Sequence, residues 1–275
     1  MSAGDLFLGG LTTHRLTPTA ITASSEQGAY PAVNVDDFLH PLRPWKAATT
    51  DVEWIKLAFG AAIDLAAIYV GWIGIDSELD FSIQANLTDD WTAPLVDQLI
   101  PGDLAYNPLV RRYGYAYVLP EILQAAYVRV LFPGHSGTAV SVGQLLAVTE
   151  DVGQRVPNRP GISFGKRQRG AQNSFEGGGA ERLSLGVPQM TLGFSWEWAY
   201  NYLETSELNE TDVLLSPQVL ADYDDALLVV PDLELLPHRA SIFRPAAGGD
   251  GVDMTIQSDA GIGARLALAY EEVIG

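Results

Sequence analysis

Side chains able to support catalysis are few and scattered in this chain. The four histidines, at positions 14, 40, 135 and 238, show no spacing typical of a metal site or a catalytic triad. The chain has no His-Glu-x-x-His sequence, no phosphate-binding loop of the Gly-Lys-Ser/Thr type and no Gly-rich dinucleotide fingerprint. A pair of glycosidase carboxylates remains an alternative, because the two residues of such a pair come from distant segments of the chain. These observations favour a non-enzymatic protein.

Four residues in expected loops or strand ends are candidates for a carbohydrate site: Trp91, Tyr106, Tyr113 and His135. An aromatic ring can stack on the apolar face of a sugar while polar groups fix the sugar's orientation. His135 lies in the sequence Pro-Gly-His-Ser-Gly, which follows an expected strand, and loops at such places often carry binding residues. The alternative roles are structural, with Trp91 packed in the fold and His135 a simple loop histidine.

Paired acids offer oxygen ligands for a hard cation at Asp36-Asp37, Asp89-Asp90 and Asp224-Asp225. None of these pairs follows the spacing of an EF-hand loop. Asp36 and Asp37 are the best placed for a calcium ion, and no other cofactor is expected. The alternative is that these acids cap turns, which are acid-rich in an acidic protein.

Positive charge is concentrated at Lys166, Arg167 and Arg169, inside a glycine-rich stretch over residues 165–180. We expect this stretch to be a loop. A solvated loop is the simplest interpretation. The sharper hypothesis is that the three side chains dock on an acidic face of a neighbouring identical subunit.

Composition and charge restrict the classes of partner. With 47% hydrophobic and only 18% charged residues, the 275-residue chain is expected to be compact and to form two domains. Its formal charge of -18 would repel a phosphate backbone, so nucleic acid is not an expected partner. No apolar run approaches the roughly 20 residues of a membrane helix, which argues against membrane insertion. A sparsely charged, acidic surface that exposes aromatic residues fits a homo-oligomer.

Short runs of β-branched and aromatic residues, separated by Gly, Pro, Asn and Asp, predict an all-β fold. In the first half we expect strands at Thr19–Ala23, Glu53–Ala58, Ala67–Ile73, Phe81–Ala85, Tyr113–Leu119, Ala126–Phe132 and Val140–Val148. In the second half we expect strands at Gln189–Trp198, Ala226–Val230, Ala240–Phe243, Val252–Gln257 and Arg265–Tyr270. Short helical segments are expected at Pro31–Phe38 and Glu207–Leu220. The composition changes near Thr149, which divides the chain into domains 1–150 and 151–275.

Three motifs in the first half follow one another at a characteristic spacing. Residues 21–37 are Ile-Thr-Ala-Ser-Ser-Glu-Gln-Gly-Ala-Tyr-Pro-Ala-Val-Asn-Val-Asp-Asp, followed by Pro-Trp-Lys-Ala at 44–47 and Glu-Trp-Ile-Lys-Leu at 53–57. They resemble the opening of discoidin domains, also called coagulation-factor C-terminal-type or galactose-binding-like domains. The resemblance covers residues 15–150 and implies a jelly-roll β-sandwich with Trp45 in its core. We expect the two antiparallel layers to close around Trp54, and a second, small β-rich domain to follow.

The combination of such a sandwich with Pro-Gly-Ile-Ser-Phe-Gly at 160–165, a glycine-rich stretch and a second strand domain resembles structural tail proteins of tailed bacteriophages. This resemblance implies a distal or minor tail protein of the tail tip or baseplate. Such a protein is located in the virion and contacts copies of itself, other tail and baseplate proteins and a host-surface glycan. The alternative is a carbohydrate-binding, lectin-like adhesin. A glycan-cleaving enzyme with its catalytic half at 150–275 is a third and less favoured alternative.

Overall fold

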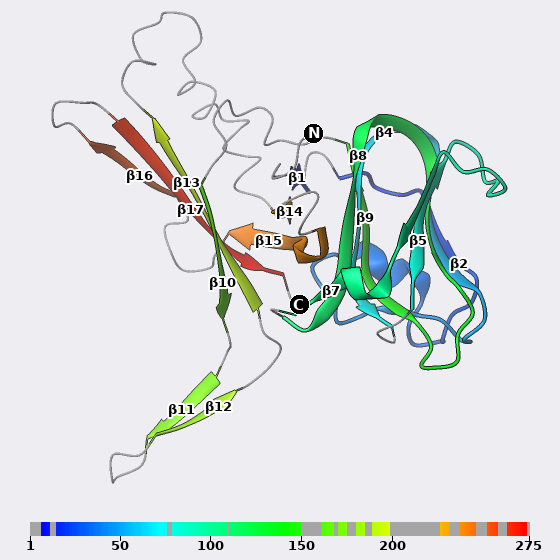
Figure 1. Cartoon of the computed structure of the whole chain (residues 1–275), viewed down its shortest axis with the longest axis horizontal. Helices are drawn as coiled ribbons and strands as arrows, with labels where there is room; N and C mark the ends of the chain where they lie inside the picture. Colours follow the sequence, from blue (N-terminus) through cyan, green and yellow to red (C-terminus); the bar gives the residue numbers. More distant parts are fainter. Residues whose placement is uncertain are drawn as a thin grey trace, which may run out of the picture.

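The computed structural model describes residues 7–11, 15–75, 79–108, 110–149, 161–167, 170–174, 180–184, 189–198, 226–231, 237–245, 252–257 and 263–273. Within these ranges the chain forms β-strands joined by turns and short 3-10 helices, without an α-helix (Figure 1). The described residues accordingly include no helix with the length and apolar character of a membrane span. The prediction of an all-β fold is confirmed.

The first half of the chain forms an eight-stranded sheet that folds over into a β-sandwich (Figure 1). Its main path is β3-β9-β4-β8-β5-β6, with β2 added to β4 and β7 added to β8, and all of these pairs are antiparallel. The strands are β2 Ala20–Ala23, β3 Trp45–Lys46, β4 Glu53–Gly74, β5 Phe81–Asn86, β6 Val96–Ile100, β7 Tyr106–Asn107, β8 Arg112–Phe132 and β9 Ser141–Val148. The 3-10 helices η1 (Ala32–Asp36) and η2 (Gly102–Ala105) connect them. Helix η1 confirms the helical turn expected at 31–38.

Strands β4 and β8 are long enough to run through both layers of the sandwich. Their register shifts between Ala58 and Ile63, and Gly60 has a φ of 75°. An irregularity of this kind bends a strand. The first part of β4 therefore pairs with β2 in one layer, and its last part pairs with β9 in the other. The sequence predicted two separate strands in each of these segments, but pairing between β4 and β8 resumes beyond the exposed bend and keeps each strand continuous.

The core of the sandwich is built around a buried tryptophan, as expected for Trp45. This side chain is fully buried, and its indole N–H donates to the carbonyl oxygen of Ser25 at 2.9 Å. Its ring centroid lies 6.5 Å from that of Phe132, which lies 5.6 Å from that of Phe81. These aromatic contacts join the short edge strand β3 to β8 and β5 in the middle of the sheet.

Trp54 does not occupy the central position that the sequence predicted. Side chains alternate between the two faces of a strand. Ile55 and Leu57 take the inward positions of β4 and are buried, so Trp54 lies on the outer face, where it is only half-buried. The prediction that the layers close around Trp54 is therefore wrong.

The second half forms a seven-stranded sheet in the order β1-β14-β15-β17-β13-β10, with β16 paired to β17. Its elements are β1 Phe7–Gly10, β10 Gly161–Arg167, β13 Gln189–Trp198, β14 Leu227–Val230, the 3-10 helix η5 Pro237–Arg239, β15 Ser241–Pro245, β16 Val252–Gln257 and β17 Gly263–Glu272. Strand β1 precedes the sandwich in the sequence, yet it pairs with β14, with Phe7 opposite Val230. The helix expected at Glu207–Leu220 lies outside the described residues.

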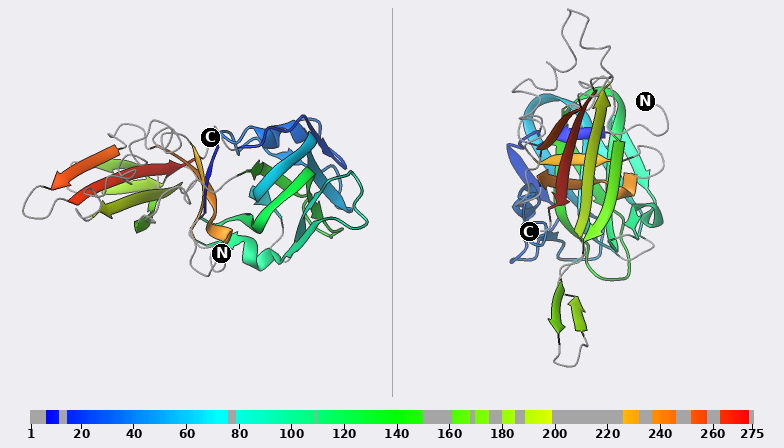
Figure 2. Two further views of the ribbon diagram at one scale, coloured as in Figure 1. Left: turned by 90° about the horizontal axis from the view of Figure 1, so that it is seen from above. Right: turned by 90° about the vertical axis from the view of Figure 1, so that its left-hand side faces the viewer.

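A two-stranded ribbon extends from this sheet, between β10 and β13 in the sequence (Figures 1 and 2). It consists of β11 (Gly170–Ser174) and β12 (Ala180–Ser184), which form a sheet of their own. We call residues 166–190 the arm. The prediction that residues 165–180 are a loop is wrong in the described part, because Gly165–Arg167 pair with β13 and β11 pairs with β12. Backbone hydrogen bonds between strands order this sequence despite its glycine content.

One outer face of the sandwich is covered by the second sheet. Tyr69 of β4 and Val148 of β9 share a buried hydrophobic cluster with Phe7, Leu228 and Ile242 of β1, β14 and β15. We call this contact the junction, and it gives the two halves a common core. The opposite outer face of the sandwich is formed by β2, β6, β5 and the parts of β4 and β8 that lie beside them (Figure 1). We call it the open face.

Candidate functional site

A row of polar side chains crosses the open face from strand to strand. Strand register places Thr22 opposite Lys56, Lys56 opposite Arg129, Arg129 opposite Gln84, and Gln84 opposite Asp97. The row forms because each of these residues takes an outward position on its strand, next to inward neighbours such as those at 55, 57, 128 and 130, which are buried. Cross-strand neighbours lie close enough to interact directly.

Asp89 connects this row to the loop between β5 and β6. The Lys56 ammonium lies 2.5 Å from Asp89 Oδ2, and the Trp91 indole N–H donates to Asp89 Oδ1 at 2.8 Å. The hydrogen bond from Lys56 holds the pKa of Asp89 below its ordinary value, with smaller contributions from the Trp91 hydrogen bond and from the charge of Arg129. Asp89 is therefore a carboxylate at neutral pH that fixes both a cation and an aromatic ring.

Arg129 fixes the same indole from another side. Its guanidinium lies 4.1 Å from the centroid of the Trp91 ring. Its Nε and Nη2 donate to Gln84 Oε1 at 2.8 and 2.6 Å, and Gln84 Nε2 donates to Asp97 Oδ1 at 2.9 Å. Partial burial lowers the pKa of Arg129, and the charges of Asp89 and Asp97 oppose that effect. The guanidinium therefore stays charged and is held in one orientation.

Two further aromatic rings flank Lys56. Its ammonium lies 5.3 Å from the ring centroid of Trp54 and 5.7 Å from that of Tyr127, so these two centroids are at most 11 Å apart. Trp54, Tyr127 and Trp91 are all half-buried. We call Trp54, Lys56, Trp91, Tyr127 and Arg129 the aromatic platform. It combines flat apolar surfaces with hydrogen-bond donors, which is the chemistry that a sugar ring requires.

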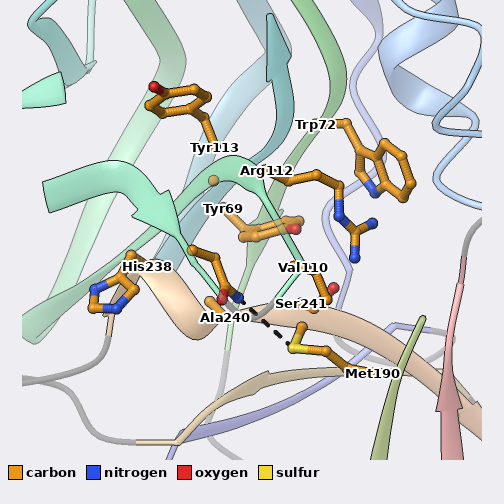
Figure 3. A pocket seen from close by; sticks show the side chains of 11 residues that line it. Tyr69, Trp72, Val110, Arg112, Tyr113, Met190, His238, Ala240 and Ser241 are labelled. Atoms are coloured by element: carbon orange, nitrogen blue, oxygen red, sulfur yellow. Dashed lines mark hydrogen bonds between the residues drawn. The ribbon is translucent and has the colours of Figure 1, made fainter. Parts of the chain in front are cut away.

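A pocket lies at the junction of the two halves (Figure 3). It encloses about 240 Å³, including space open to solvent. Its described lining residues come from β4, β7, β8, β13, η5, β15 and the links before β8 and β15. They are Tyr69, Trp72, Asn107, Val110, Arg112, Tyr113, Gly114, Met190, His238, Ala240 and Ser241. The Arg112 guanidinium stacks 3.9 Å from the centroid of the Trp72 ring, and Asn107 Nδ2 donates to Met190 Sδ at 3.7 Å. Burial, followed by the charge of Arg239, lowers the pKa of His238.

An unusual backbone conformation borders this pocket. Trp72 has a φ of 55°, in the left-handed region that non-glycine residues seldom adopt. In the register with β8, Gly71 pairs with Gly114 and Ile73 with the adjacent Tyr113, so Trp72 has no partner there, whereas the register with β9 does not shift. Trp72 is thus the extra residue of a β-bulge, and such bulges re-aim a side chain. Here the bulge directs the Trp72 indole against the Arg112 guanidinium.

The structure separates the four residues predicted for a carbohydrate site. Trp91 belongs to the open face, whereas Tyr113 lines the junction pocket, and its ring centroid lies 5.0 Å from that of Tyr106. His135 lies in the loop after β8, where its ring nitrogens are 2.9 Å from the Thr138 carbonyl oxygen and 3.4 Å from that of Pro133. These residues therefore do not form one site.

The residues predicted to hold calcium interact with basic side chains. Arg15 Nη2 pairs with Asp36 Oδ1 and donates to the Asp36 carbonyl oxygen at 3.0 Å. The Asp37 carboxylate lies 2.8 Å from His40 Nδ1. Across the described ranges, acids and histidines form no group of three that could hold a metal ion. The structure thus places Asp36 and Asp37 in ion pairs at the end of η1.

Two of the three predicted interface residues lie in a strand. Lys166 and Arg167 are the last residues of β10 and pair with Met190 and Gln189 of β13. Arg169 lies outside the described residues.

The sequence reasoning missed most of the platform. Trp54 was expected in the core, and Lys56, Tyr127 and Arg129 were assigned to strands only. Polar and aromatic residues nevertheless alternate with aliphatic ones in Glu-Trp-Ile-Lys-Leu and in Ala-Tyr-Val-Arg-Val. This period of two signals an outer face. The cross-strand pairing of Lys56 with Arg129 could not be obtained from it, because the register of two distant strands is not local information.

Comparison with known proteins gives structural similarities only, since no family model and no curated protein matches this sequence. The family 32 carbohydrate-binding module of C. perfringens NanJ, in complex with galactose, is 11% identical, and the match covers 52% of this chain and 98% of that chain with a TM-score of 0.38. Chitosan-binding module 1 of a chitosanase/glucanase from Paenibacillus sp. IK-5 is 18% identical, with coverages of 49% and 98% and a TM-score of 0.38. The CBM32 of AlyQ, in complex with 4,5-unsaturated mannuronic acid, is 17% identical, with coverages of 50% and 98% and a TM-score of 0.39. Each similarity thus spans about half of this chain and nearly all of the module.

Proposed function

We propose that this protein is a non-catalytic carbohydrate-binding protein, acting as a lectin-like adhesin, whose aromatic platform contacts the glycan. The observation that carries the proposal is the placement of Trp54, Tyr127 and Trp91 on the one outer face of the sandwich that the second sheet does not cover. Their rings supply stacking surfaces, and Lys56 and Arg129 lie between them.

Several side chains of the platform are already held in place by contacts within the protein, which supports this function. Binding costs free energy when side chains must be immobilised, at about 0.5–1.5 kcal/mol for each rotamer-rich side chain. Asp89 and Gln84 already hold Lys56 and Arg129 in hydrogen bonds, and Asp89 and Arg129 already hold Trp91. A sugar that stacks on the platform therefore meets a surface that needs little further ordering.

Two features support a binding role over catalysis. A glycosidase general acid needs a raised pKa, whereas the Lys56 hydrogen bond lowers that of Asp89. Residues 161–165 spell Gly-Ile-Ser-Phe-Gly, a pattern shared with the nucleophile elbow of hydrolases. An elbow requires a strand-to-helix turn, but all five residues lie in β10 and pair with β13. Ser163 is therefore part of an ordinary strand.

The proposal is tested by screening the whole chain on a glycan array and measuring the best ligand by calorimetry. Trp54→Ala and Trp91→Ala should each weaken the affinity about tenfold or more, equivalent to about 1.4 kcal/mol. Tyr30→Ala is the matched control, because Tyr30 is a half-buried ring with the Lys46 ammonium 4.1 Å from its centroid, but it lies in the loop after β2. A chain that binds no glycan would refute the function. Binding that depends on Tyr30 but not on the platform would refute the site.

A structural subunit of a phage tail tip or baseplate, located in the virion, is the second candidate. The feature that favours it is the arm, which extends beyond a sheet packed firmly on the sandwich and is suited to contact a neighbouring subunit. Mass measurement separates the two candidates. A closed ring that co-purifies with tail proteins supports the tail subunit, and a chain that binds a glycan without retaining tail proteins supports the adhesin.

A further inference from the structure

Positive charge is distributed unevenly along the chain. Residues 152–184 contain six of the 16 Lys and Arg residues and two of the 34 acids, which gives this segment a formal charge of +4. The other residues contain ten basic and 32 acidic side chains, which gives them a formal charge of -22 and the whole chain a net charge of -18. The chain therefore has one basic segment on an otherwise strongly acidic body.

Three of these six basic residues lie on strands that the structure describes. Lys166 and Arg167 lie where β10 ends, opposite Met190 and Gln189, and Arg182 lies in β12, opposite Gln172. Two views agree that the ribbon β11–β12 lies beyond the end of the seven-stranded sheet and away from the sandwich (Figures 1 and 2). The described ribbon, which carries Arg182, thus lies apart from the sandwich.

The ribbon has an incomplete set of backbone partners. Among the described strands, β11 pairs only with β12, so each has one edge without a neighbouring strand. A two-stranded ribbon is marginally stable in water without further packing, and its free edges present N–H and C=O groups that a second chain can engage. This observation is independent of the charge and indicates that the arm is completed by a contact.

We propose that the arm docks on the acidic surface of a second copy of this chain. A basic arm and an acidic body on the same chain are complementary when two copies meet head to tail, and such a contact can repeat from one copy to the next. The proposal goes beyond glycan binding and does not require it. If both hold, assembly brings several platforms to one surface and raises the effective concentration of each after the first has bound.

Light scattering after gel filtration tests the proposal. Salt weakens both the attraction between arm and acidic surface, which favours association, and the repulsion between acidic bodies, which opposes it. Charges interact over about 30 Å at 0.01 M salt and over only about 3 Å at 1 M, because salt screens them beyond these distances. If the arm holds the copies together, the chain associates at low salt and becomes monomeric at high salt. If repulsion between acidic bodies dominates, the chain is monomeric at low salt, and that result overturns the proposal.

Charge reversal tests whether the basic residues of the arm make the contact between copies. The double substitution K166E/R167E should abolish association at low salt. The matched control R43E/R111E changes the net charge equally at two exposed arginines of the sandwich, and it should leave association unchanged. Equal loss in both variants would show that only net charge matters and would overturn the proposal. Glycan binding at high salt should be the same in all three proteins, so failure of docking is distinguishable from failure of the proposed function.

A capture experiment tests the head-to-tail arrangement. Immobilised K166E/R167E keeps its acidic body and should retain wild-type chain at low salt, because the wild-type arm is intact. The same variant in solution should not be retained on itself. Loss of both interactions would show that arms bind arms, and retention of both would show that the arm is not involved. Either result overturns the proposal.

Discussion

Replacing Gly143 by alanine tests how closely β9 packs on the bulge at Trp72. A Cβ atom at Gly143 would lie 2.4 Å from the carbonyl oxygen of Pro41 and 2.7 Å from the Cβ atom of Trp72. Neither atom is the far end of a flexible side chain. Trp72 also has its φ at 55°, so the backbone on that side is already confined to an uncommon conformation. The added methyl group can be accommodated only by moving backbone.

The expected cost follows from this geometry. Overpacking a well-packed interior usually costs about 1–3 kcal/mol. We expect Gly143→Ala to lower the free energy of unfolding by this amount, measured by urea denaturation. Thermal unfolding provides a second readout, with a decrease of about 2–4 °C for each kcal/mol in domains of 150–250 residues.

Gly28→Ala is the matched control for this substitution. A Cβ atom at Gly28 meets nothing within 4 Å, so its effect should stay within about 0.5 kcal/mol. If the two variants unfold at the same urea concentration, the close approach of Pro41, Gly143 and Trp72 does not contribute to stability, and the reasoning is refuted.

Two further predictions concern buried groups, one inside the sandwich and one at the junction. Glu53 is buried and accepts hydrogen bonds from the hydroxyl groups of Ser24, Ser25 and Thr49. Burial alone would raise the pKa of Glu53, but these bonds outweigh it, and the pKa is lowered from 4.5. A lowered pKa stabilises the fold above about pH 4.5, and this contribution is lost as the pH falls through the folded-state value. Glu53→Gln should therefore cost about 1.5–3 kcal/mol at neutral pH by urea denaturation and progressively less in acid, and a gap that is constant with pH would contradict this cause. The exposed control Glu121→Gln should have no effect. Phe7 is fully buried at the junction, so Phe7→Ala should cost about 3–5 kcal/mol, whereas Leu104→Ala, at a side chain that is 54% exposed, should cost little. A loss below about 1 kcal/mol for Phe7→Ala would show that β1 does not hold the two halves together.

Local patterns were sufficient to predict most strands and the buried tryptophan. Segments such as Phe81–Ala85 alternate apolar and polar residues with a period of two, and Trp45 follows a turn-rich segment in the order found in discoidin domains. They did not predict that β4 and β8 continue through a bend, because residues 60–64 begin with glycine and end with aspartate, which are equally typical of a turn. The arm was mistaken for a loop for the same reason.

The candidate site was only partly accessible to prediction. Trp91 was identified as an aromatic residue in a loop, but its partners Asp89 and Arg129 are contributed by the same loop and by a distant strand. The junction pocket was not predicted at all, because it depends on packing between η5, β13 and the sandwich. Sequence patterns specify which face of a strand is buried, whereas they do not specify which second sheet will cover the other face.

The pairing of β1 with β14 has a consequence for synthesis on the ribosome. Phe7 emerges first, but its partner Val230 emerges only after the whole sandwich and the arm have been made. The sandwich can fold while the second sheet is still incomplete, and during that interval the apolar strand Phe7–Gly10 has no place to pair. A nascent chain stalled before residue 226 should therefore leave this strand accessible to chaperones. Among the described strand pairs, completion of β14 then closes the longest loop, and β15 adds to β14 afterwards.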